Sequence, residues 1–369
     1  MPTIGLDASR LHKSHKTGTE SYAYNLTREL LKLPTEAEWI LYSNAELPPE
    51  LLGINPKVRQ VISPQKRFWT ISGLAKAVRK DPADILLNFA TPQPIGVKIP
   101  SITVIHGIEF EHVPQNYSLF AFWHLVLSTW WTGKKSKSII TPTQATRQDL
   151  IEMYDVPEDK VKVIHSGLPG ELPDNKDKEP SPTIKHILEK PFLLWIGRKE
   201  YRKNVDTLIL AFNELKKEHT FEDLQLVIAG SKGHGYKWVK EALRISNHRD
   251  SVHNLEYVTE NEKKLLFDHA KGFVFPSLAE GFGFPVLEAQ SYRVPVIASD
   301  IPSLREVGGE GVIYVHPEDI DQIVKAMREI LTEQEVTKTL IDKGAQNTKR
   351  FSFTQTAQAF YRHVEEVLT

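Results

Sequence analysis

Two glutamates, Glu280 and Glu288, stand eight residues apart in the segment EGFGFPVLE and are the most informative candidates for chemistry in the sequence. The glycines between them, Gly281 and Gly283, allow a tight turn that aims backbone N–H groups at a ligand. Pro285 suits the first turn of a helix, and the N-terminus of a helix favours anions. One glutamate precedes this helix and the other lies about one turn inside it. We therefore predict a pocket in which both carboxylates accept hydrogen bonds from ligand hydroxyls.

The absence of cysteine narrows the chemistry further. Without cysteine the chain has no thiol nucleophile, no disulfide framework and no cysteine-based zinc or iron–sulfur site. Catalysis must then use carboxylates, histidine, lysine, arginine or hydroxyl groups. No Asp-x-Asp motif stands directly at the end of a predicted strand, so we expect no metal site.

Further candidate residues follow predicted strands, where open parallel sheets bind their ligands. Arg198 and Lys203 follow the first strand of the second half of the chain, and His106 follows a strand of the first half. A turn-rich segment with Thr17, Gly18 and Thr19 follows the first strand of the chain. Taken alone, the two cations are ordinary surface residues and the histidine is an ordinary structural one. Their positions after strands make them candidates.

The elements that position these residues are short apolar runs that alternate with helical patterns along the chain. This alternation is typical of parallel sheets built from βαβ units, and a length of 369 residues favours two domains. The fold class is therefore α/β, with two doubly wound parallel sheets. The predicted parts are an N-terminal domain (1–172), a linker rich in Pro, Asp, Glu and Lys (173–190), a second domain (191–350) and a C-terminal helix that could pack on either domain (351–369). The predicted strands are Thr3–Ala8, Trp39–Tyr42, Val58–Ile62, Ile85–Asn88, Ile102–Ile105, Ser138–Thr141, Val161–Ile164, Phe192–Ile196, Gln225–Ala229, Leu255–Val258, Gly272–Phe275, Val294–Ala298 and Val312–Val315.

Several of these segments resemble one family of enzymes. EGFGFPVLE resembles the E-x7-E signature of the retaining glycosyltransferases of family 4, also called group 1, and WIGRKEYRKN and LVIAGSKG are similar to the family's phosphate-side elements. The resemblance covers essentially the whole chain, because further similar stretches occur in the same order. It implies the GT-B fold, in which two Rossmann-like domains face each other across a cleft. The sequence departs from the family pattern at two places. The segment AQSYR follows Glu288, and Thr17-Gly18-Thr19 stands in place of the family's Gly-Gly turn. The second departure leaves the residues of the acceptor side undetermined.

The resemblance also implies a function and roles for residues. It implies a hexosyltransferase that moves a hexose, with retention, from a GDP- or UDP-sugar to a hydroxyl of a glycan or lipid-linked acceptor in polysaccharide or glycolipid synthesis. Glu280 would bind hydroxyls of the donor sugar, Arg198 and Lys203 would hold the diphosphate in place of a metal, and no cofactor besides the nucleotide sugar would be needed. His106 would lie near the reacting sugar and Glu288 would bind the ribose. Other implied donor-binding residues are Gly197, Ser231, Gly281, Phe282, Gly283 and Glu306, and Thr17, Gly18 and Thr19 would form an acceptor or phosphate loop.

Other functions remain open on the same scaffold. A nucleotide-sugar epimerase or a sugar phosphorylase can share this fold, although no segment resembles the pyridoxal-phosphate lysine region of the phosphorylases. A non-catalytic subunit that binds sugar nucleotides is a further alternative. A nicotinamide dehydrogenase is disfavoured, because no G-x-G-x-x-G follows the first predicted strand.

The charge pattern bears on partners and location. A net charge of −1 argues against a general nucleic-acid binder. Two stretches, Leu51–Lys80 and Val113–Gln148, carry basic residues and no Asp or Glu, and the second contains the aromatic run YSLFAFWHLVLSTWW. If their basic residues share a face, that face could meet an anionic membrane, and the alternative is a buried aromatic helix. With no leader sequence and no apolar run of the roughly 18 residues needed to cross a bilayer, we expect a cytoplasmic chain with peripheral contact to the inner face of the plasma membrane.

Overall fold

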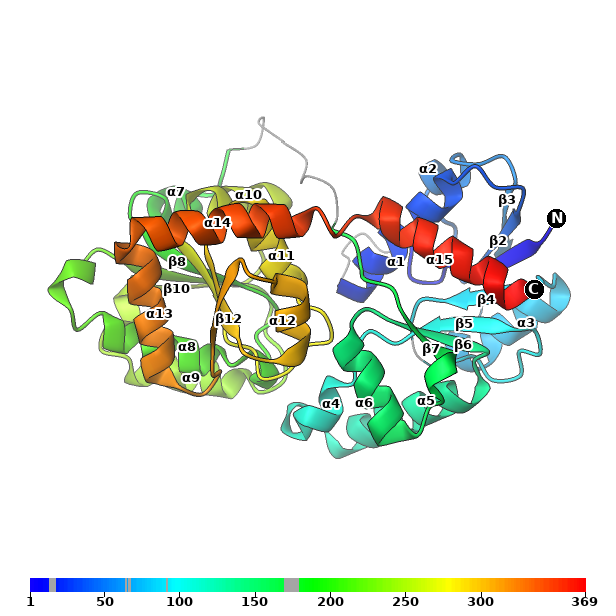
Figure 1. The fold of residues 1–369 in the computed structure, drawn as a ribbon, viewed down its shortest axis with the longest axis horizontal. Helices are drawn as coiled ribbons and strands as arrows, with labels where there is room; N and C mark the ends of the chain where they lie inside the picture. The colour runs from blue at the N-terminus through cyan, green and yellow to red at the C-terminus, as the bar shows by residue number, and fades with distance from the viewer. Residues whose placement is uncertain (13–17, 64, 66–67, 91, 169–178) are drawn as a thin grey trace. The chain divides into compact units, whose positions relative to one another are not determined.

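A computed structural model of the chain describes residues 1–12, 18–63, 65, 68–90, 92–168 and 179–369. The chain divides into two compact units, each with a parallel sheet flanked by helices (Figure 1). Unit 1 contains Met1–Ile108, Leu119–Pro169 and Phe351–Thr369, and unit 2 contains Glu109–Ser118 and Gly170–Arg350. The predicted α/β class with two doubly wound parallel sheets is confirmed.

The sheet of unit 1 has the strand order β3-β2-β1-β4-β5-β6-β7, with neighbouring strands paired in parallel. The order reverses its direction between β1 and β4, because the chain first adds strands on one side of β1 and then on the other. Its strands are β1 (Thr3–Asp7), β2 (Glu38–Ser43), β3 (Val58–Ile62), β4 (Ile85–Asn88), β5 (Ser101–Val104), β6 (Ser138–Thr141) and β7 (Val161–Val163).

Helices cover both faces of this sheet, which accounts for the continuous apolar runs of its central strands. The C-terminal helix α15 lies beside α1, and its Ala357, Phe360 and Val364 are fully buried. Ser352 caps α15 by accepting a hydrogen bond from the Gln355 N–H. The helices of unit 1 are α1 (Gly18–Lys32), α2 (Pro49–Leu52), α3 (Leu74–Lys80), α5 (Leu119–Lys135), α6 (Gln144–Tyr154) and α15 (Phe353–Leu368), with a π-helical turn at Trp69–Gly73 and a 3-10 turn at Glu158–Lys160.

The sheet of unit 2 has the strand order β10-β9-β8-β11-β12-β13, again with parallel neighbours. Its strands are β8 (Phe192–Ile196), β9 (Gln225–Ala229), β10 (Val252–Leu255), β11 (Gly272–Phe275), β12 (Val296–Ser299) and β13 (Val312–Val315). Its longer helices are α8 (Val205–Leu215), α9 (Tyr236–Ile245), α10 (Glu260–His269), α11 (Phe284–Ser291), α13 (Ile320–Thr332) and α14 (Gln334–Thr348). Its shorter helices are α4 (Glu109–His112), α7 (Pro182–Ile187) and α12 (Pro302–Gly308), with 3-10 turns η2 (Pro114–Asn116), η4 (Tyr201–Lys203), η5 (His219–Phe221) and η6 (Arg249–Ser251).

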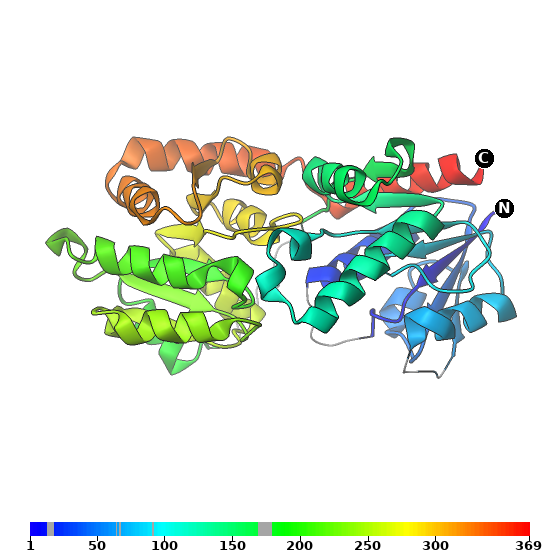
Figure 2. The same ribbon diagram turned by 90° about the horizontal axis from the view of Figure 1, so that it is seen from below.

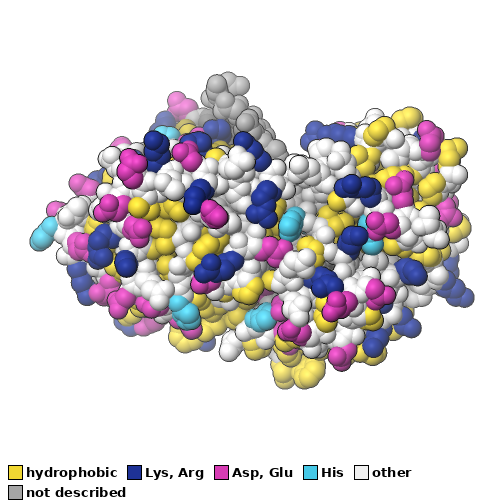
Figure 3. All heavy atoms as spheres, in the orientation of Figure 1, with side chains coloured by type: hydrophobic (Ala, Val, Ile, Leu, Met, Phe, Trp, Pro, Cys, Tyr) yellow, Lys and Arg dark blue, Asp and Glu magenta, His cyan; other side chains and the backbone are white. Residues whose placement is uncertain are grey.

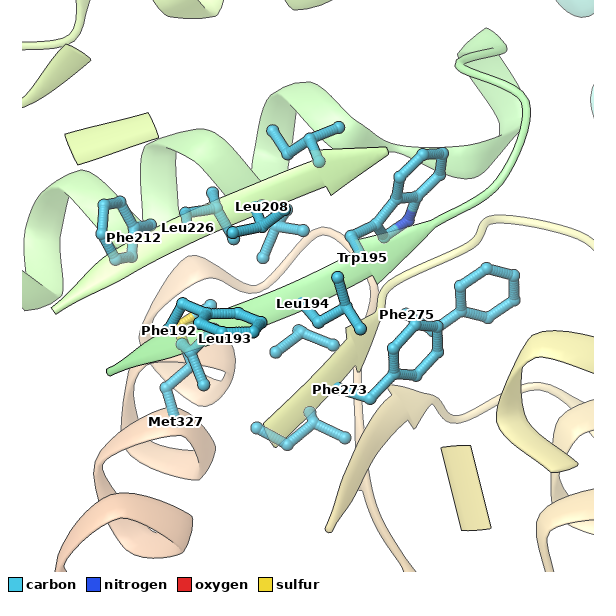
Figure 4. Close-up of a cluster of buried hydrophobic side chains, with 14 of the residues drawn as sticks. Phe192, Leu193, Leu194, Trp195, Leu208, Phe212, Leu226, Phe273, Phe275 and Met327 are labelled. Atoms are coloured by element: carbon cyan, nitrogen blue, oxygen red, sulfur yellow. The ribbon is translucent and has the colours of Figure 1, made fainter. Parts of the chain in front are cut away.

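The core of unit 2 is built around β8 (Figure 4). All side chains of Phe192–Trp195 are buried, so the strand is apolar on both faces. Figure 4 shows Phe212 of α8, Met327 of α13 and the β11 phenylalanines around this strand. A rigid central strand of this kind fixes the loop that follows it, and that loop carries the candidate site.

The structure differs from the sequence-based expectations at several places, among them β12, which begins at Val296 and not at the predicted Val294. The strand predicted at Leu255–Val258 is wrong by three residues, because β10 begins at Val252 and includes the polar His253 and Asn254. β10 is an edge strand, where polar side chains remain half-exposed and do not disturb the core. Residues assigned to the linker form the helix α7, and Glu109–Ser118, assigned to the N-terminal domain, belong to unit 2.

Charged side chains are intermixed on the surface. Figure 3 shows lysines and arginines interspersed with acidic side chains over the visible face of each unit. This distribution agrees with the net charge of −1.

Candidate active site

The candidate site of unit 2 lies at the carboxyl edge of its sheet, between β8 and β11. The strand order reverses there, since β9 and β10 lie on one side of β8 and β11, β12 and β13 on the other. Loops that follow adjacent parallel strands diverge at such a point and leave a crevice for ligands. The β8 loop carries Arg198 and Lys203, and the β11 loop carries Glu280. The fold therefore brings together residues that are almost 80 positions apart in the sequence.

These residues form a continuous chain of alternating charges. Arg198 Nη1 lies 3.2 Å from Glu200 Oε1, and Glu200 Oε2 lies 3.1 Å from Arg202 Nε. Arg202 Nη1 donates to Glu280 Oε2 at 3.1 Å, and the Lys203 ammonium contacts Glu280 Oε1. The chain of charges thus contains three cations and two carboxylates, and Glu109 is a third carboxylate that acts on Arg202.

Burial differs along this chain of charges. The Arg198 side chain is 63% exposed, whereas those of Lys203 and Glu280 are 9% and 7% exposed. Burial raises the pKa of Glu280, but the charges of Lys203 and Arg202 outweigh it and lower the pKa to about 2. Burial and the neighbouring Arg202 lower the pKa of Lys203, which Glu280 partly opposes. Glu280 is therefore a fixed anion at neutral pH, and Lys203 depends on it to remain charged.

The ionised carboxylate of Glu280 contributes to stability in a way that depends on pH. The pKa of Glu280 in the folded chain, about 2, lies below its ordinary value of 4.5, so its charged form stabilises the fold fully above about pH 4.5. That contribution is lost as the pH falls from 4.5 toward 2. We expect the difference in the free energy of unfolding between the wild type and a Glu280→Gln variant to shrink over this range. Urea titrations at stepped pH would measure it, and a constant difference would contradict the ion-pair assignment.

The start of α11 depends on an unusual backbone. Gly283 is the N-cap residue and adopts φ = +113°, a conformation that side chains disfavour. A Cβ atom at this position would lie 2.5 Å from Leu304 Cδ2. Pro285 occupies the first turn as predicted, and Phe282 is buried against Phe284. The glycine therefore sets both the turn and its packing on α12.

A substitution at Gly283 tests this geometry. Gly283→Ala is expected to lower the free energy of unfolding by about 2 kcal/mol or more, because it adds backbone strain to a steric clash. Gly53→Ala is a matched control, since Gly53 has φ = −81° and its added Cβ would lie 3.4 Å from the nearest described atom. Chemical denaturation would compare the two variants. Equal stability of both would show that the turn at Gly283 tolerates a side chain.

Two residues from the segment 109–118 contact the same loops of unit 2. Glu109 Oε1 accepts a hydrogen bond from the Gly281 N–H at 3.0 Å, and Asn116 Oδ1 accepts one from the Arg202 N–H at 3.3 Å. A carboxylate on the N–H of Gly281 demonstrates that this backbone donor faces a position that an anionic or hydroxyl-bearing group can occupy.

The loops after β8 and β9 are packed tightly against each other. The Gly197 N–H donates to the Ala229 carbonyl, and the Lys199 N–H donates to the Ser231 carbonyl at 2.9 Å. A Cβ atom at Gly230 would lie 1.8 Å from the Gly197 carbonyl oxygen, so glycine is required for this approach. Gly197 and Ser231 therefore lie on adjacent backbone segments, and the Ser231 side chain is exposed.

A buried lysine braces the same loops. Lys199 is fully buried, and its ammonium donates to Asn254 Oδ1 and to the Leu255 carbonyl, both at 2.6 Å. Burial lowers the pKa of Lys199 to about 8. This side chain ties the β8 loop to the end of β10.

The second glutamate has its own partner. Glu288 Oε1 lies 2.7 Å from the Nζ atom of Lys263 on α10, and both side chains are about four-fifths buried. Burial opposes the charge of Lys263, but Glu288 raises its pKa. Glu280 and Glu288 thus pair with different cations. Glu306 lies on α12 and is half-buried.

In unit 1, His106 lies near the point where the strand order reverses. It follows β5, and its Nε2–H donates to the Phe89 carbonyl at 2.8 Å after β4. Its ring packs edge-on against Tyr22 of α1, with ring centres 4.7 Å apart. Because a carbonyl oxygen only accepts, Nε2 of His106 carries a proton.

Two of the three residues of the predicted acceptor loop can be placed. Gly18 and Thr19 begin α1, which follows β1 at the same edge of the sheet. Thr17 lies outside the described residues. The beginning of α1 and His106 thus both follow the carboxyl ends of strands in unit 1, where ligands of such sheets bind.

Arg202, Lys263 and Glu109 are site residues that sequence reasoning missed. Arg202 stands in the segment KEYRKN beside Lys203, so a third cation was visible there. The 3-10 turn η4 decides that Arg202 points toward Glu280, and no periodicity in the sequence indicates this turn. Among the described residues, no group of three or more His, Asp or Glu side chains could hold a metal ion.

Comparison with known families and proteins agrees with this geometry. The family model for glycosyl transferases group 1 matches residues 177–347, and the model for Glycosyltransferase Family 4 matches residues 16–171. The chain is 24% identical to O-antigen chain mannosyltransferase B of Escherichia coli, over 82% of this chain and 78% of that protein. It is 26% identical to O-antigen chain mannosyltransferase RfbU of Salmonella typhimurium, over 61% of this chain and 59% of that protein. The second match therefore spans about three fifths of the relative's length.

Solved structures show the same fold. Sucrose-phosphate synthase from Thermosynechococcus elongatus superposes with a TM-score of 0.73 at 17% identity, covering 100% of this chain and 99% of that chain. Anabaena Alr3699/HepE in complex with UDP-glucose superposes with a TM-score of 0.71 at 16% identity, covering 99% of each chain. The two family models together account for nearly the whole chain and for the two parallel-sheet units. The chain belongs to the group 1, family 4 glycosyltransferases with the GT-B fold, and it is a transferase of the glycosyl class.

Proposed function

We propose that this glycosyltransferase moves a hexose from a nucleotide-diphosphate sugar to a hydroxyl group of a glycan or lipid-linked acceptor, with retention at the anomeric carbon. The observation that carries the proposal is the chain of charges from Arg198 to Lys203 after β8, in which Arg202 and Lys203 hold Glu280 of the β11 loop. An anionic diphosphate needs cations and a polyhydroxylated sugar needs hydrogen-bond acceptors, and this arrangement supplies both side by side.

The cations act on the leaving group. When the bond between the anomeric carbon and the diphosphate breaks, negative charge develops on the departing phosphate oxygen. Arg198 is exposed and able to reach a phosphate, and Lys203 supplies a second charge. These fixed cations would replace a metal ion, so we propose a reaction without metal and without a cofactor beyond the nucleotide sugar.

The carboxylates act on hydroxyls. Glu280 is ionised at neutral pH and held in place by two cations, which suits it to accept hydrogen bonds from the donor sugar. Glu288 would accept from the ribose. Gly281, Phe282 and Gly283 form the turn in front of α11, where a sugar hydroxyl would take the place of Glu109 on the Gly281 N–H.

Retention follows from attack on the same face that the diphosphate leaves. The acceptor oxygen forms a bond to the anomeric carbon as the bond to the phosphate oxygen breaks, and the acceptor proton passes to that phosphate oxygen. The positive charge of the oxocarbenium-like state is stabilised by the nearby diphosphate. We assign His106, Gly18 and Thr19, which follow strands of unit 1, to the acceptor side of the reaction.

The sugar and the acceptor are inferred from the relatives. The E. coli and Salmonella proteins are described as O-antigen chain mannosyltransferases, which supports mannose as the transferred hexose and a cell-envelope glycan as the product. An epimerase on this fold or a non-catalytic subunit would need the same donor site. Either one would bind the nucleotide without moving sugar to an acceptor.

A panel of donors separates these functions. The purified chain is incubated with GDP-mannose, UDP-glucose and other nucleotide sugars, and release of the nucleoside diphosphate and the shift of the melting temperature are measured. We expect one donor to stabilise the chain and to be turned over, with the α-configuration kept in the product. Conversion of the nucleotide sugar to an epimer would favour the epimerase. Binding without turnover in the presence of envelope glycan acceptors would favour the non-catalytic subunit.

A further inference from the structure

The helix α5 of unit 1 differs from an ordinary surface helix, because it buries small polar residues and exposes large apolar ones. Its buried residues are small and mostly polar, namely Ser128, Thr129, Thr132 and Gly133. Five of its large apolar residues are 50–83% exposed, and Phe122, Leu125, Val126 and Trp131 are half-buried. These exposed residues are Leu119, Phe120, Trp123, Leu127 and Trp130.

The exposed apolar residues form one stripe. Their spacing of three and four positions places them on a single face of the helix. Figure 2 shows α5 (teal) lying in front of the strands of unit 1, so this helix forms an outer layer of the unit. A contiguous apolar stripe of this kind marks an interaction surface.

The buried side holds α5 firmly in place. The Gln93 N–H donates to Thr132 Oγ1 at 3.0 Å, and Trp131 Nε1–H donates to the Gln93 carbonyl at 3.1 Å. Lys160 Nζ donates to the Gly133 carbonyl at 2.6 Å. The stripe therefore lies on a helix that is held in place by hydrogen bonds. Its large apolar residues are exposed although the helix itself is well packed.

The stripe ends in a basic region. Lys134, Lys135 and Lys137 follow it and are exposed, and Lys135 lies over the Trp131 ring at 5.3 Å. A cavity of about 950 Å³ adjoins this end of the helix. Its charged side chains are the cations Lys98, Lys135, Lys137 and Lys160 and the acids Asp159 and Glu366, with His363 beside Glu366.

The cavity is separate from the candidate acceptor residues. Its lining includes residues 96–100, 135–137, Pro157, Asp159 and Lys160, which precede β5, β6 and β7. His106, in contrast, follows the carboxyl end of β5. In a parallel sheet the amino ends and the carboxyl ends of the strands lie on opposite sides. A ligand in the cavity therefore leaves the side with His106 accessible.

We propose that the exposed face of α5 docks in the plane of an anionic phospholipid bilayer, with the lysines at its end on the headgroup phosphates and one headgroup in the adjoining cavity. Tryptophan and leucine suit the boundary between headgroups and acyl chains, and cations near it are attracted by anionic lipid. The absence of Asp and Glu from α5 removes the repulsion that acidic side chains would add. This docking goes beyond the transfer reaction and does not depend on it.

The structure places this role on the second acid-free stretch of the sequence. In the first stretch, Lys57 pairs with Glu36, and Arg59 pairs with Glu38 and Asp81. Lys76, Arg79 and Lys80 of this stretch are exposed, but the apolar residues of their helix α3 are buried, so α3 presents no apolar stripe beside these charges. Lys66 and Arg67 lie outside the described residues. Among the described residues, no helix is long and apolar enough to cross a bilayer.

Sedimentation of the full chain with vesicles tests the proposal. The vesicles contain either phosphatidylcholine alone or an equal mixture with phosphatidylglycerol, at low and high salt. We expect binding to the mixed vesicles that weakens with salt, because exposed charges are screened beyond about 8 Å at physiological ionic strength. Replacing the lysines by Lys134→Gln, Lys135→Gln and Lys137→Gln should weaken this binding roughly 100-fold.

The apolar stripe is tested separately. Trp123→Gln with Leu127→Gln and Trp130→Gln should abolish sedimentation while the melting temperature stays within a few degrees, because these side chains are exposed. The matched controls on unit 2 are Trp238→Gln and the set Lys237→Gln, Lys240→Gln and Lys271→Gln, which should bind vesicles as the wild type does.

Three outcomes would overturn the proposal. These are no sedimentation of the wild type at low salt, equal binding to neutral and mixed vesicles, and unchanged binding of the α5 variants. Dimerisation that only the stripe variant removes, without vesicle binding, would assign the surface to a second copy of the chain. Binding of nucleoside diphosphates, measured by thermal shift, is expected to be the same in all variants and reports on the donor site independently.

Discussion

Glu280→Gln is expected to lower kcat/KM for glycosyl transfer by roughly 30- to 1000-fold, equivalent to about 2–4 kcal/mol of barrier. The amide keeps the shape of the side chain but removes the anion that we propose accepts hydrogen bonds from sugar hydroxyls. It also leaves Arg202 and Lys203 without the carboxylate that joins them. Steady-state kinetics with the native donor would measure the loss.

The same variant is expected to be less stable. Removing one member of a buried ion pair leaves an uncompensated charge, which costs up to about 3–5 kcal/mol. Because burial and Arg202 already lower the pKa of Lys203, the lysine can release its proton, and we expect the cost to fall at the low end of this range.

A matched control separates a site effect from a general loss of charge. Glu310→Gln removes an exposed carboxylate that lies 3.0 Å from Lys343 and should change neither rate nor stability by more than about 0.5 kcal/mol. Undiminished transfer by Glu280→Gln would show that the donor sugar binds elsewhere.

Much of the fold could be predicted from the sequence because parallel strands buried on both faces are uniformly apolar. Phe192–Ile196 and Gly272–Phe275 have the predicted limits for this reason. The limits of β10 differ from the predicted ones, because an edge strand tolerates polar residues such as Asn254. Here Asn254 is a partner of Lys199. The edge strands β3 and β13 have the predicted limits, so the polar residues of β10 account for the difference, and its edge position alone does not.

The site could be predicted only as far as strand order allows. Glu280 and Lys203 were candidates because each follows a strand, and adjacency of β8 and β11 brings them into contact. The inward orientation of Arg202 depends on a single 3-10 turn, and the contact of Glu109 with Gly281 joins segments 172 positions apart. Neither leaves a periodic signal. The outward face of α5 was equally ambiguous, because exposed and buried aromatic helices have similar sequences.

The second large effect is expected for Lys203→Met, which should lower kcat/KM by roughly 100-fold or more and weaken binding of the nucleoside diphosphate product about tenfold. Methionine keeps much of the buried volume but removes the charge that pairs with Glu280 and that we propose acts on the leaving diphosphate. Kinetics and product titration measured together distinguish loss of diphosphate binding from loss of folding. Lys217→Met is the control, because Lys217 is exposed and pairs only locally with Glu214.

A double-mutant cycle shows whether Lys203 acts on the diphosphate or only supports Glu280. If it only supports Glu280, Lys203→Met in the Glu280→Gln background costs nothing further, and product binding stays as in Glu280→Gln alone. If it also binds the diphosphate, product binding weakens again in the double variant. The same cations predict that transfer survives removal of divalent metals by EDTA, whereas an absolute requirement for a divalent cation would mean that Arg198 and Lys203 do not suffice to stabilise the leaving group.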